Sequence, residues 1–397
     1  MKKEIDIIIY GATGFTGSLC VKYLKKNYPK LKWSIGGRNK EKLTELSNKY
    51  DLNTKIFIAE GDDSNGLDKM TEKTKVILST AGPFHRYGSK LVESCVKNST
   101  HYVDITGETF WIKEMIKKHH EEAKRKSIRI IPSCGFDSIP SDLGVYYACR
   151  EFGNSVESIH SFYKWKGEAS GGTIETMFSS SDNKKRYLGP FGLVPKNSIS
   201  NIQKKHTSDR INITKNSKIN AWSGPFIMAI PNANIVRRSA ALLAELGKGY
   251  GDNFIYKEHA YYSNKFRAYL GTIFLAIFGL TLFTPLKKIV RPFLKKPGQG
   301  PSKKVMDEGF FKGQFVLKGE DGNTNIYELF GQGDPGYKLT SLFVCESAIA
   351  LLEDPSNLSG GLSYGGVLTP ASGLGNILIN RLQDAGISFK KILCDFF

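Results

Sequence analysis

Cysteine is scarce in this sequence, and its few copies follow no metal-binding or disulfide pattern. Six cysteines are spread over 397 residues, without a Cys-x-x-Cys pair and without histidines at the spacing of zinc ligands. We therefore expect no metal site. Six cysteines in a chain of this size also do not resemble a disulfide scaffold, which favours a reducing compartment.

Acidic residues are also in short supply. The chain has 38 Asp and Glu against 56 Lys and Arg, which gives a formal net charge of +18. Residues 201–300 alone carry 16 Lys and Arg against 4 Asp and Glu. Such an excess suits nucleic acid, an anionic membrane surface or a phosphorylated small molecule. Because no nucleic-acid-binding module is recognisable, we expect no nucleic-acid partner.

Long apolar runs are missing except for one, AYLGTIFLAIFGLTLFTPL, which covers residues 268–286 without a charge. A helix of this length spans about 28 Å, close to the roughly 30 Å of a bilayer core. Gly279 and Pro285 weaken it as a straight span, so we expect a bent insertion into one face of a membrane. The alternative is a buried helix of a large domain. Basic residues flank the run: Arg267, Lys287, Lys288, Arg291, Lys295 and Lys296.

The first 135 residues alternate short runs rich in Ile and Val with amphipathic stretches. This alternation predicts βαβ units and an α/β fold with a doubly wound parallel sheet. Residues 136–370 have longer polar stretches and strand patterns such as HSFYKWKG and FKGQFVLKGE, which predict a second, α+β domain that includes the apolar run. Residues 371–397 predict a terminal amphipathic helix.

Three glycines, Gly11, Gly14 and Gly17, follow the first predicted strand in IIIYGATGFTG. In a Rossmann domain such glycines permit a tight turn, the approach of a pyrophosphate and close packing of helix on strand. Ala12 replaces one glycine of the stricter fingerprint, but a strand before and a helix after the turn support the assignment. We therefore expect a dinucleotide to contact this turn, including Thr13, Phe15 and Thr16.

The second predicted strand ends in SIGGRN, with no acidic residue to bind a ribose 2′-hydroxyl. Arg38 instead offers a guanidinium that matches a 2′-phosphate, so we expect NADP, with NAD as the less favoured cofactor. Ligands of such sheets lie beyond the carboxyl ends of the strands. This places Asp62 near the adenine or its ribose, and Ala81, Gly82 and Pro83 along the cofactor.

These residues resemble a known family, the saccharopine dehydrogenase-like oxidoreductases, which are related to bacterial trans-acting enoyl reductases. The resemblance covers nearly the whole chain. Its most distinctive part is GFDSIPSDLG, and the other motifs are YGATGFTG, IGGRN, STAGPFHRYG, YVDITGE, ASGGT and GGVLTPASGLG.

The resemblance implies an N-terminal NADP-type Rossmann domain, a saccharopine-reductase-like second domain and a C-terminal helix that returns to the first domain. It also implies membrane or lipid-droplet association in eukaryotic members and a link to glycolipid metabolism in bacterial relatives. The N-terminal apolar run stops at Gly11, too early for a signal peptide. We therefore expect the cytoplasmic side of a membrane or lipid droplet, and no secretion.

Acidic residues that follow the fifth and sixth predicted strands are candidates for proton transfer. They are Asp104, Glu108, Asp137 and Asp142. Of these we favour Asp137 and, second, Asp104 as catalytic groups; the alternative for Asp137 is an ordinary cap of the following helix, a role that Ser138 or Ser141 would fill equally well.

A second glycine-rich segment, ASGGT, predicts a turn in which Gly171, Gly172 and Thr173 present polar groups to a substrate. Tyr163 and Glu168 are secondary candidates.

Three functions are compatible with these features. The first is an NADP-dependent oxidoreductase at a membrane or lipid-droplet surface that reduces a lipid-like C=C, C=O or C=N group. The second is a membrane scaffold that keeps the Rossmann fold without turnover. The third is a soluble saccharopine-type enzyme acting on amino acids, which would need arginines that converge on carboxylates. Arg186, Arg210, Arg237 and Arg238 form no recognisable pattern for this.

Overall fold

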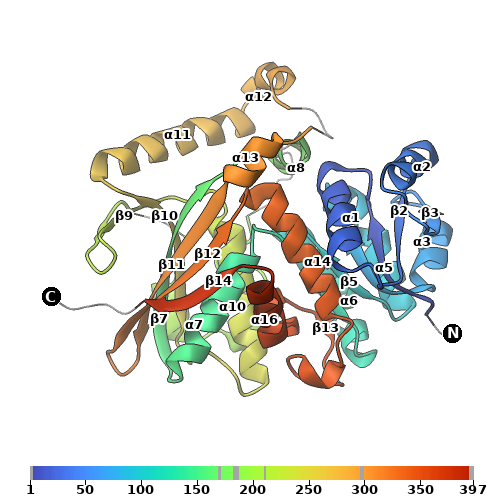
Figure 1. The fold of residues 1–397 in the computed structure, drawn as a ribbon. Helices are drawn as coiled ribbons and strands as arrows, with labels where there is room; N and C mark the ends of the chain where they lie inside the picture. The colour runs from blue at the N-terminus through green and yellow to red at the C-terminus, as the bar shows by residue number, and fades with distance from the viewer. Residues whose placement is uncertain (1–2, 169–170, 182–186, 210–211, 296–298, 393–397) are drawn as a thin grey trace.

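Two seven-stranded sheets form the frame of the molecule (Figure 1). The computed structural model describes residues 3–168, 171–181, 187–209, 212–295 and 299–392. The first sheet has the order β13-β6-β5-β4-β1-β2-β3, and every pair of neighbours is parallel. Its strands are β1 (Ile5–Tyr10), β2 (Trp33–Gly37), β3 (Ile56–Ile58), β4 (Thr74–Ser79), β5 (His101–Asp104), β6 (Arg129–Ile131) and β13 (Gly366–Val367).

Helices cover both faces of the first sheet, as the continuous burial of Ile7 to Tyr10 along β1 requires. Ile7 and Ile9 pack with α1 (Phe15–Asn27), α2 (Lys40–Lys49) and α14 (Thr340–Ala350). Ile8 and Tyr10 point to the other face, towards α3 (Ser64–Thr71), α5 (Ser89–Lys97) and α6 (Thr109–Arg125). Strands buried on both faces are typical of doubly wound α/β proteins, so the predicted Rossmann fold is confirmed.

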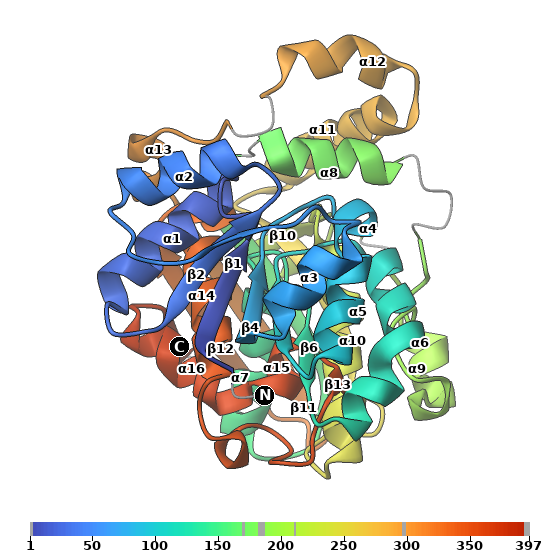
Figure 2. The ribbon, with the colours of Figure 1, turned by 90° about the vertical axis from the view of Figure 1, so that its right-hand side faces the viewer.

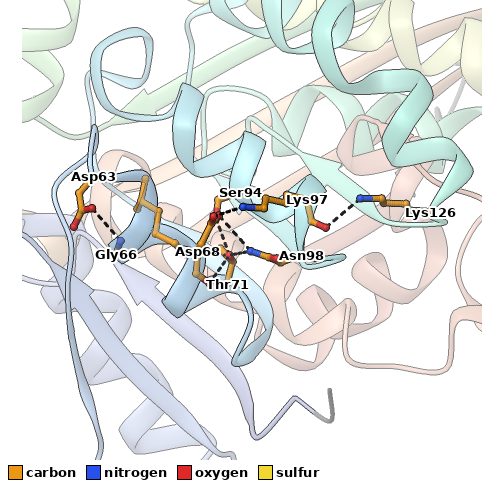
Figure 3. A network of polar contacts seen from close by, with 9 residues as sticks. Asp63, Gly66, Asp68, Thr71, Ser94, Lys97, Asn98 and Lys126 are labelled. Atoms are coloured by element: carbon orange, nitrogen blue, oxygen red, sulfur yellow. Dashed lines mark hydrogen bonds and ion pairs between the residues drawn. The ribbon is translucent and has the colours of Figure 1, made fainter.

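Helix α3 is not apparent from the apolar pattern of the sequence, and polar side chains hold it in place (Figure 3). Asp63 begins the helix by accepting a hydrogen bond from the N–H of Gly66 at 3.0 Å. Asp68 then joins α3 to α5, because its carboxylate accepts hydrogen bonds from Ser94 Oγ and Lys97 Nζ at 2.5 Å each. A cap and cross-helix contacts thus replace a long amphipathic stripe.

The second sheet is mixed, with the order β14-β12-β11-β7-β10-β9-β8. Its strands are β7 (Val156–Lys166), β8 (Lys215–Asn216), β9 (Ala221–Gly224), β10 (Ile255–Tyr262), β11 (Phe310–Gly319), β12 (Thr324–Gln332) and β14 (Ser388–Ile392). The two strands expected from HSFYKWKG and FKGQFVLKGE are β7 and β11, which pair antiparallel with Phe162 opposite Gln314. Helices α7 (Ile139–Phe152) and α10 (Ala229–Glu245) pack against this sheet, which completes the second, α+β part of the fold.

The C-terminal segment connects the two parts. Strand β13 adds to the edge of the first sheet beside β6, and β14 adds to the edge of the second sheet beside β12. Between them lie α15 (Pro370–Gly373) and α16 (Gly375–Asp384), the predicted terminal helix, which packs on both α14 and α7. Residues 371–392 therefore contact both parts of the molecule.

The remaining helices lie in the second part of the chain. They are α8 (Gly171–Ser181), α9 (Asn201–His206), α12 (Leu286–Val290) and α13 (Lys303–Glu308), together with the short turns η1 (Lys196–Ser198), η2 (Arg291–Phe293), η3 (Pro335–Leu339) and η4 (Pro355–Asn357). A further short helix, α4 (Phe84–Tyr87), follows β4. The turn expected at ASGGT is wrong for Gly171, Gly172 and Thr173, because α8 begins at Gly171 and includes all three; Ala169 and Ser170 lie outside the described residues.

The predicted apolar helix is α11 (Lys265–Phe283), shifted towards the N-terminus relative to residues 268–286. Its start is set by Asn264, whose side chain accepts a hydrogen bond from the N–H of Arg267 at 2.9 Å, and the helix ends before Pro285. Among the described residues it is the one helix whose length and composition would allow it to cross a membrane. Only Ala268 and Leu282 are buried along it.

Candidate functional site

A large cavity lies between the two sheets, beyond the carboxyl ends of the strands of the first sheet. Its volume is about 1390 Å³. One end is lined by the glycine turn after β1 and the loops after β2, β3 and β4, and the other end reaches α8 and α11. Since ligands of doubly wound sheets bind at this edge, the cavity has the location of a dinucleotide site that continues into a second compartment.

Two of the glycines in the first turn are required by close approaches of the backbone. Gly11 has φ +84°, and an added Cβ would lie 2.9 Å from the backbone nitrogen of Ala81. A Cβ on Gly17 would lie 2.3 Å from the carbonyl oxygen of Gly11. The turn therefore needs glycine for its own geometry and for packing α1 onto β1, and Gly17 itself does not line the cavity.

The amino end of α1 opens into this cavity. Thr13, Gly14, Phe15 and Thr16 line it, and no described side chain caps the helix at Gly14. The N–H groups of a first helical turn lack acceptors within the helix and attract anions. The chain thus offers a place for the phosphates of a dinucleotide, and these residues fit the expected cofactor.

The loops after the next strands line the same end of the cavity. Arg38 is exposed, and its guanidinium lies 5.9 Å from the centre of the Tyr87 ring. Asp62, Ala81 and Gly82 also line the cavity. Pro83 instead precedes α4 and does not line it. Arg38 is positioned on the cavity wall, where a 2′-phosphate could be bound.

Asp137 lies on the cavity wall near the junction of the two compartments. Its Oδ2 is 3.6 Å from the position that a Cβ on Gly107 would take, and the Met228 methyl group is beside the same point. Among the described residues none donates a hydrogen bond to its carboxylate, and Ser138, not Asp137, is the residue at the amino end of α7. Burial raises the pKa of Asp137 to about 6. Such a group can hold a proton near neutral pH.

The other acidic candidates are engaged in hydrogen bonds that support the fold. Asp104 is fully buried and does not line the cavity; it accepts hydrogen bonds from the N–H groups of Thr106 and Ser133 and from the Tyr102 hydroxyl. Burial nevertheless raises the pKa of Asp104 to about 7.

Glu108 does line the cavity, and it accepts hydrogen bonds from the N–H groups of Phe84 and His85 at 2.8 and 2.9 Å. Asp142 is fully buried and accepts a hydrogen bond from the N–H of Ala371 at 2.8 Å. Both carboxylates therefore fix loops and helix starts.

The second compartment is largely apolar. Aromatic and aliphatic side chains from β7, α8, α10 with its preceding loop, and α11 form its walls: Trp165, Met177, Phe226, Ile227, Met228, Ile230, Leu275, Phe278 and Leu282. Of the predicted substrate residues, Thr173 and Glu168 line the cavity, and Thr173 Oγ1 lies 2.6 Å from the Tyr337 hydroxyl. Tyr163 is buried behind the wall beside Ser141. Sequence reasoning missed the apolar wall, because its residues look like ordinary core.

The described arginines of the second domain do not converge on this compartment. Among the described residues, the part of the lining that comes from the second domain contains no Arg or Lys. Arg237 is buried and paired with Asp209 at 2.9 Å, and Arg238 is buried and donates to the carbonyl oxygens of Leu193 and Val367. Arg186 and Arg210 lie outside the described residues.

Known proteins resemble this chain in sequence and in fold. Residues 7–131 match the saccharopine dehydrogenase NADP binding domain. A trans-acting enoyl reductase of Mycobacterium tuberculosis is 31% identical over 97% of each chain, and one of Mycobacterium ulcerans is 30% identical over the same shares.

Two solved structures share the fold. Saccharopine dehydrogenase (L-Glu forming) from Saccharomyces cerevisiae aligns with 98% of this chain and 100% of its own, with a TM-score of 0.54 and 13% identity. Homospermidine synthase from Legionella pneumophila, in complex with NAD, aligns with 99% and 92%, with a TM-score of 0.52 and 10% identity. The glycine turn, the position of the cavity at the sheet edge and these similarities all indicate the same family. The chain belongs to the saccharopine dehydrogenase-like oxidoreductases related to the trans-acting enoyl reductases, and its cofactor domain is of the NADP-binding type.

Proposed function

We propose that this protein uses NADPH to reduce a C=C, C=O or C=N group of a lipid-like substrate at a membrane or lipid-droplet surface, within lipid or glycolipid metabolism. The observation that carries the proposal is the continuous cavity, which runs from the glycine turn to an apolar compartment lined by α11. An apolar compartment whose described second-domain lining contains no Arg or Lys favours a neutral, apolar substrate. Because the sequence relatives are named enoyl reductases, a C=C bond is the favoured reducible group.

The chain's own residues would divide the work as follows. NADPH supplies the hydride when bound. Thr13, Gly14 and Arg38 bind the cofactor's phosphates, and the apolar wall excludes water from the reacting groups. Asp137 holds a proton on its carboxyl group at the cavity wall and donates it to the substrate. The carboxyl group has no described hydrogen-bond donor that would commit it to a capping role, which favours turnover over an inactive scaffold.

A saccharopine-type amino-acid substrate is less compatible with this site. Such substrates carry several carboxylates, and each requires a cation or several N–H donors in a dry site. The described second-domain lining offers neither Arg nor Lys.

NADPH oxidation should therefore require the lipid fraction of a cell extract and not its water-soluble fraction. Met177→Trp, which fills the apolar compartment, should abolish that activity while NADPH still binds; activity with the water-soluble fraction alone would contradict the proposal.

Arg38 should set the preference for NADPH. We expect Arg38→Ala to weaken NADPH binding by about 10- to 100-fold, since hydrogen bonds to a charged group contribute about 1.5 to 3 kcal/mol. NADH affinity should change by less than about twofold, because NADH lacks the 2′-phosphate. Fluorescence titration measures both affinities. Arg38→Lys keeps the charge without the fork and should give an intermediate loss, whereas an equal loss for NADH would refute the assignment.

The outer face of α11 supports a membrane surface as the partner. Leu275, Phe278 and Leu282 recur at helical spacing and face the cavity, while Ile277 and Leu280 on the opposite side are each 62% exposed. A helix that is apolar all round is normally covered by protein or lipid. Described basic residues at both ends, among them Arg267, Lys287 and Lys288, suit anionic headgroups, while Lys296 lies outside the described residues.

A negative charge on the outer face of α11 should weaken membrane binding. Ile277→Glu removes a side chain whose burial in lipid contributes about 1.5 to 3 kcal/mol, so vesicle binding should weaken by about 10-fold or more. Flotation with phosphatidylcholine and phosphatidylserine vesicles measures the bound fraction. Ile202, which is 50% exposed on α9, provides the matched control, and Ile202→Glu should leave binding unchanged. Equal binding of both variants and the unmodified protein would exclude α11 as the membrane face.

A further inference from the structure

The segment from α11 to η2 forms one wall of the cavity as well as an exposed apolar surface. We call residues 265–295 the strap. Helix α11 contacts β9 and α8, and after Pro285 the chain turns through α12 and η2 to lie beyond α8 (Figure 2). Figure 1 shows α11 running past β9 and β10 at the edge of the molecule. The apolar compartment is thus closed on this side by a helix in which only Ala268 and Leu282 are buried.

Two ion pairs fasten the far end of the strap to the cavity edge. Arg291 Nη2 lies 2.9 Å from Oε2 of Glu175 on α8, and its guanidinium lies 5.9 Å from the centre of the Phe178 ring. Lys295 Nζ lies 2.6 Å from Oε2 of Glu168, which lines the cavity. All four side chains are partly exposed, between 25% and 49%. Ion pairs exposed to this degree contribute little to stability, so this fastening is weak.

Beyond the strap, the chain also covers the cofactor end of the cavity. A Cβ added at Gly300 would lie 2.2 Å from Cζ of Phe15, the first residue of α1 in the glycine turn. Phe15 in turn packs edge-on against Tyr337, with ring centres 5.2 Å apart. Gly300, five residues beyond the end of the strap in the sequence, therefore lies against the cofactor turn.

We infer that the strap is a gate and that an anionic lipid surface opens it, by drawing Arg291 and Lys295 away from Glu175 and Glu168. Lipid phosphates compete with the carboxylates of the two glutamates for Arg291 and Lys295. Basic residues near an anionic bilayer are attracted to it. The outer face of α11 enters the bilayer at the same time, so the apolar compartment opens towards lipid and not towards water. This inference rests on the proposed NADPH site and membrane surface, and it adds the regulation of that site.

Release of NADPH tests the gate. The full-length protein is loaded with NADPH, and its dissociation into excess NADP⁺ is followed by stopped-flow fluorescence. Vesicles that contain phosphatidylserine should speed release by about 5- to 30-fold, the factor expected for one or two basic residues attracted to the surface. Pure phosphatidylcholine vesicles should have no effect. Acceleration by soluble glycerol phosphate at the same phosphate concentration would overturn the requirement for a bilayer.

A variant that breaks the fastening but keeps both cations provides the second measurement. The double variant Glu168→Gln and Glu175→Gln should release NADPH quickly without vesicles, and phosphatidylserine should add nothing further. Glu157→Gln is the matched control, because it breaks an exposed pair with Lys318, at 2.6 Å, that joins β7 to β11 and involves no residue of the strap. Its release should match that of the unmodified protein.

The outcomes separate this inference from the proposed function. If the protein binds NADPH and phosphatidylserine vesicles, but release is the same in every condition, the gate is refuted and the proposed function stands. If the protein binds neither NADPH nor vesicles, the proposed function fails and the gate fails with it. The gate is supported if phosphatidylserine vesicles accelerate NADPH release from the unmodified protein and the double variant releases NADPH at that faster rate without vesicles.

Discussion

Replacing Asp137 with asparagine should lower turnover by about 100-fold or more while NADPH affinity changes by less than about twofold, because a positioned general acid contributes roughly 10²- to 10⁴-fold. Asp137 lines the cavity, has no described hydrogen-bond donor and has a pKa raised by burial to about 6. Single-turnover oxidation of NADPH with the active lipid fraction measures the step directly. Unchanged turnover would assign the proton to another group.

The pH profile gives an independent check on Asp137. The protonated acid is the active form, and its fraction falls as the pH rises through the raised pKa of about 6. For the unmodified protein, kcat/KM should therefore decline above about pH 6. Asp137→Glu keeps a carboxyl group and should retain this decline, whereas Asp137→Asn should lose it.

Asp137→Asn should lower activity but raise stability above about pH 6. A carboxyl group whose folded-state pKa lies above its unfolded value stabilises the fold below the unfolded pKa, and this contribution is lost as the pH rises through the folded pKa. At pH 8 the ionised Asp137 should therefore cost about 1 to 3 kcal/mol of unfolding free energy. Asp137→Asn should be more stable than the unmodified protein at pH 8 and should approach it near pH 4. A less stable variant at pH 8 would indicate a structural role.

Replacing Arg381 with alanine should destabilise the protein by about 3 to 5 kcal/mol, the usual cost of removing one partner from a buried ion pair. Arg381 on α16 donates through Nε to Glu346 on α14 at 2.9 Å, and Glu346 is 2% exposed. Tyr23 and Tyr28 of the first domain donate to the same carboxylate at 2.7 and 2.6 Å. The variant leaves this carboxylate with neutral donors only, so the join between α1, α14 and α16 weakens.

A second glutamate beside Arg381 supplies the control. Glu353 accepts a hydrogen bond from Nη1 of Arg381 at 2.9 Å, but its side chain is 42% exposed. Glu353→Ala should therefore cost less than about 1 kcal/mol, as exposed pairs do. Urea unfolding of both variants measures the difference. Similar losses for the two variants would mean that burial of Glu346 does not decide the energetics of this cluster.

The first domain is the part of the fold that local sequence describes well. Strand β1 and helix α1 lie where the Ile-rich run and the glycine turn predict them. Such features are visible in the sequence because the residues that form them are neighbours along the chain. Helix α3 was missed, because a cap at Asp63 and contacts of Asp68 with α5 hold it instead of a periodic apolar face. The small strands β13 and β14 were missed because two distant segments must meet before either is a strand.

The acidic residues show why the site could be predicted only in part. Asp104 ends β5 and Asp137 follows β6, and nothing in their neighbours along the chain separates them. In the folded chain Asp104 accepts three hydrogen bonds away from the cavity, while Asp137 faces it. The difference arises from the loops that fold over each residue, so it is a property of packing.

The sequence by itself determined the Rossmann domain, the glycine turn and Arg38 as the candidate ligand of a 2′-phosphate, because each depends on residues close together in the chain. Tertiary structure alone decided that one face of α11 lines the same cavity as the glycine turn, and that Arg291 and Lys295 reach Glu175 and Glu168. An apolar run has the same composition whether it is covered by protein or lipid. Only the path of the chain brings α11, some 250 residues beyond the glycine turn, to the wall of the cofactor cavity.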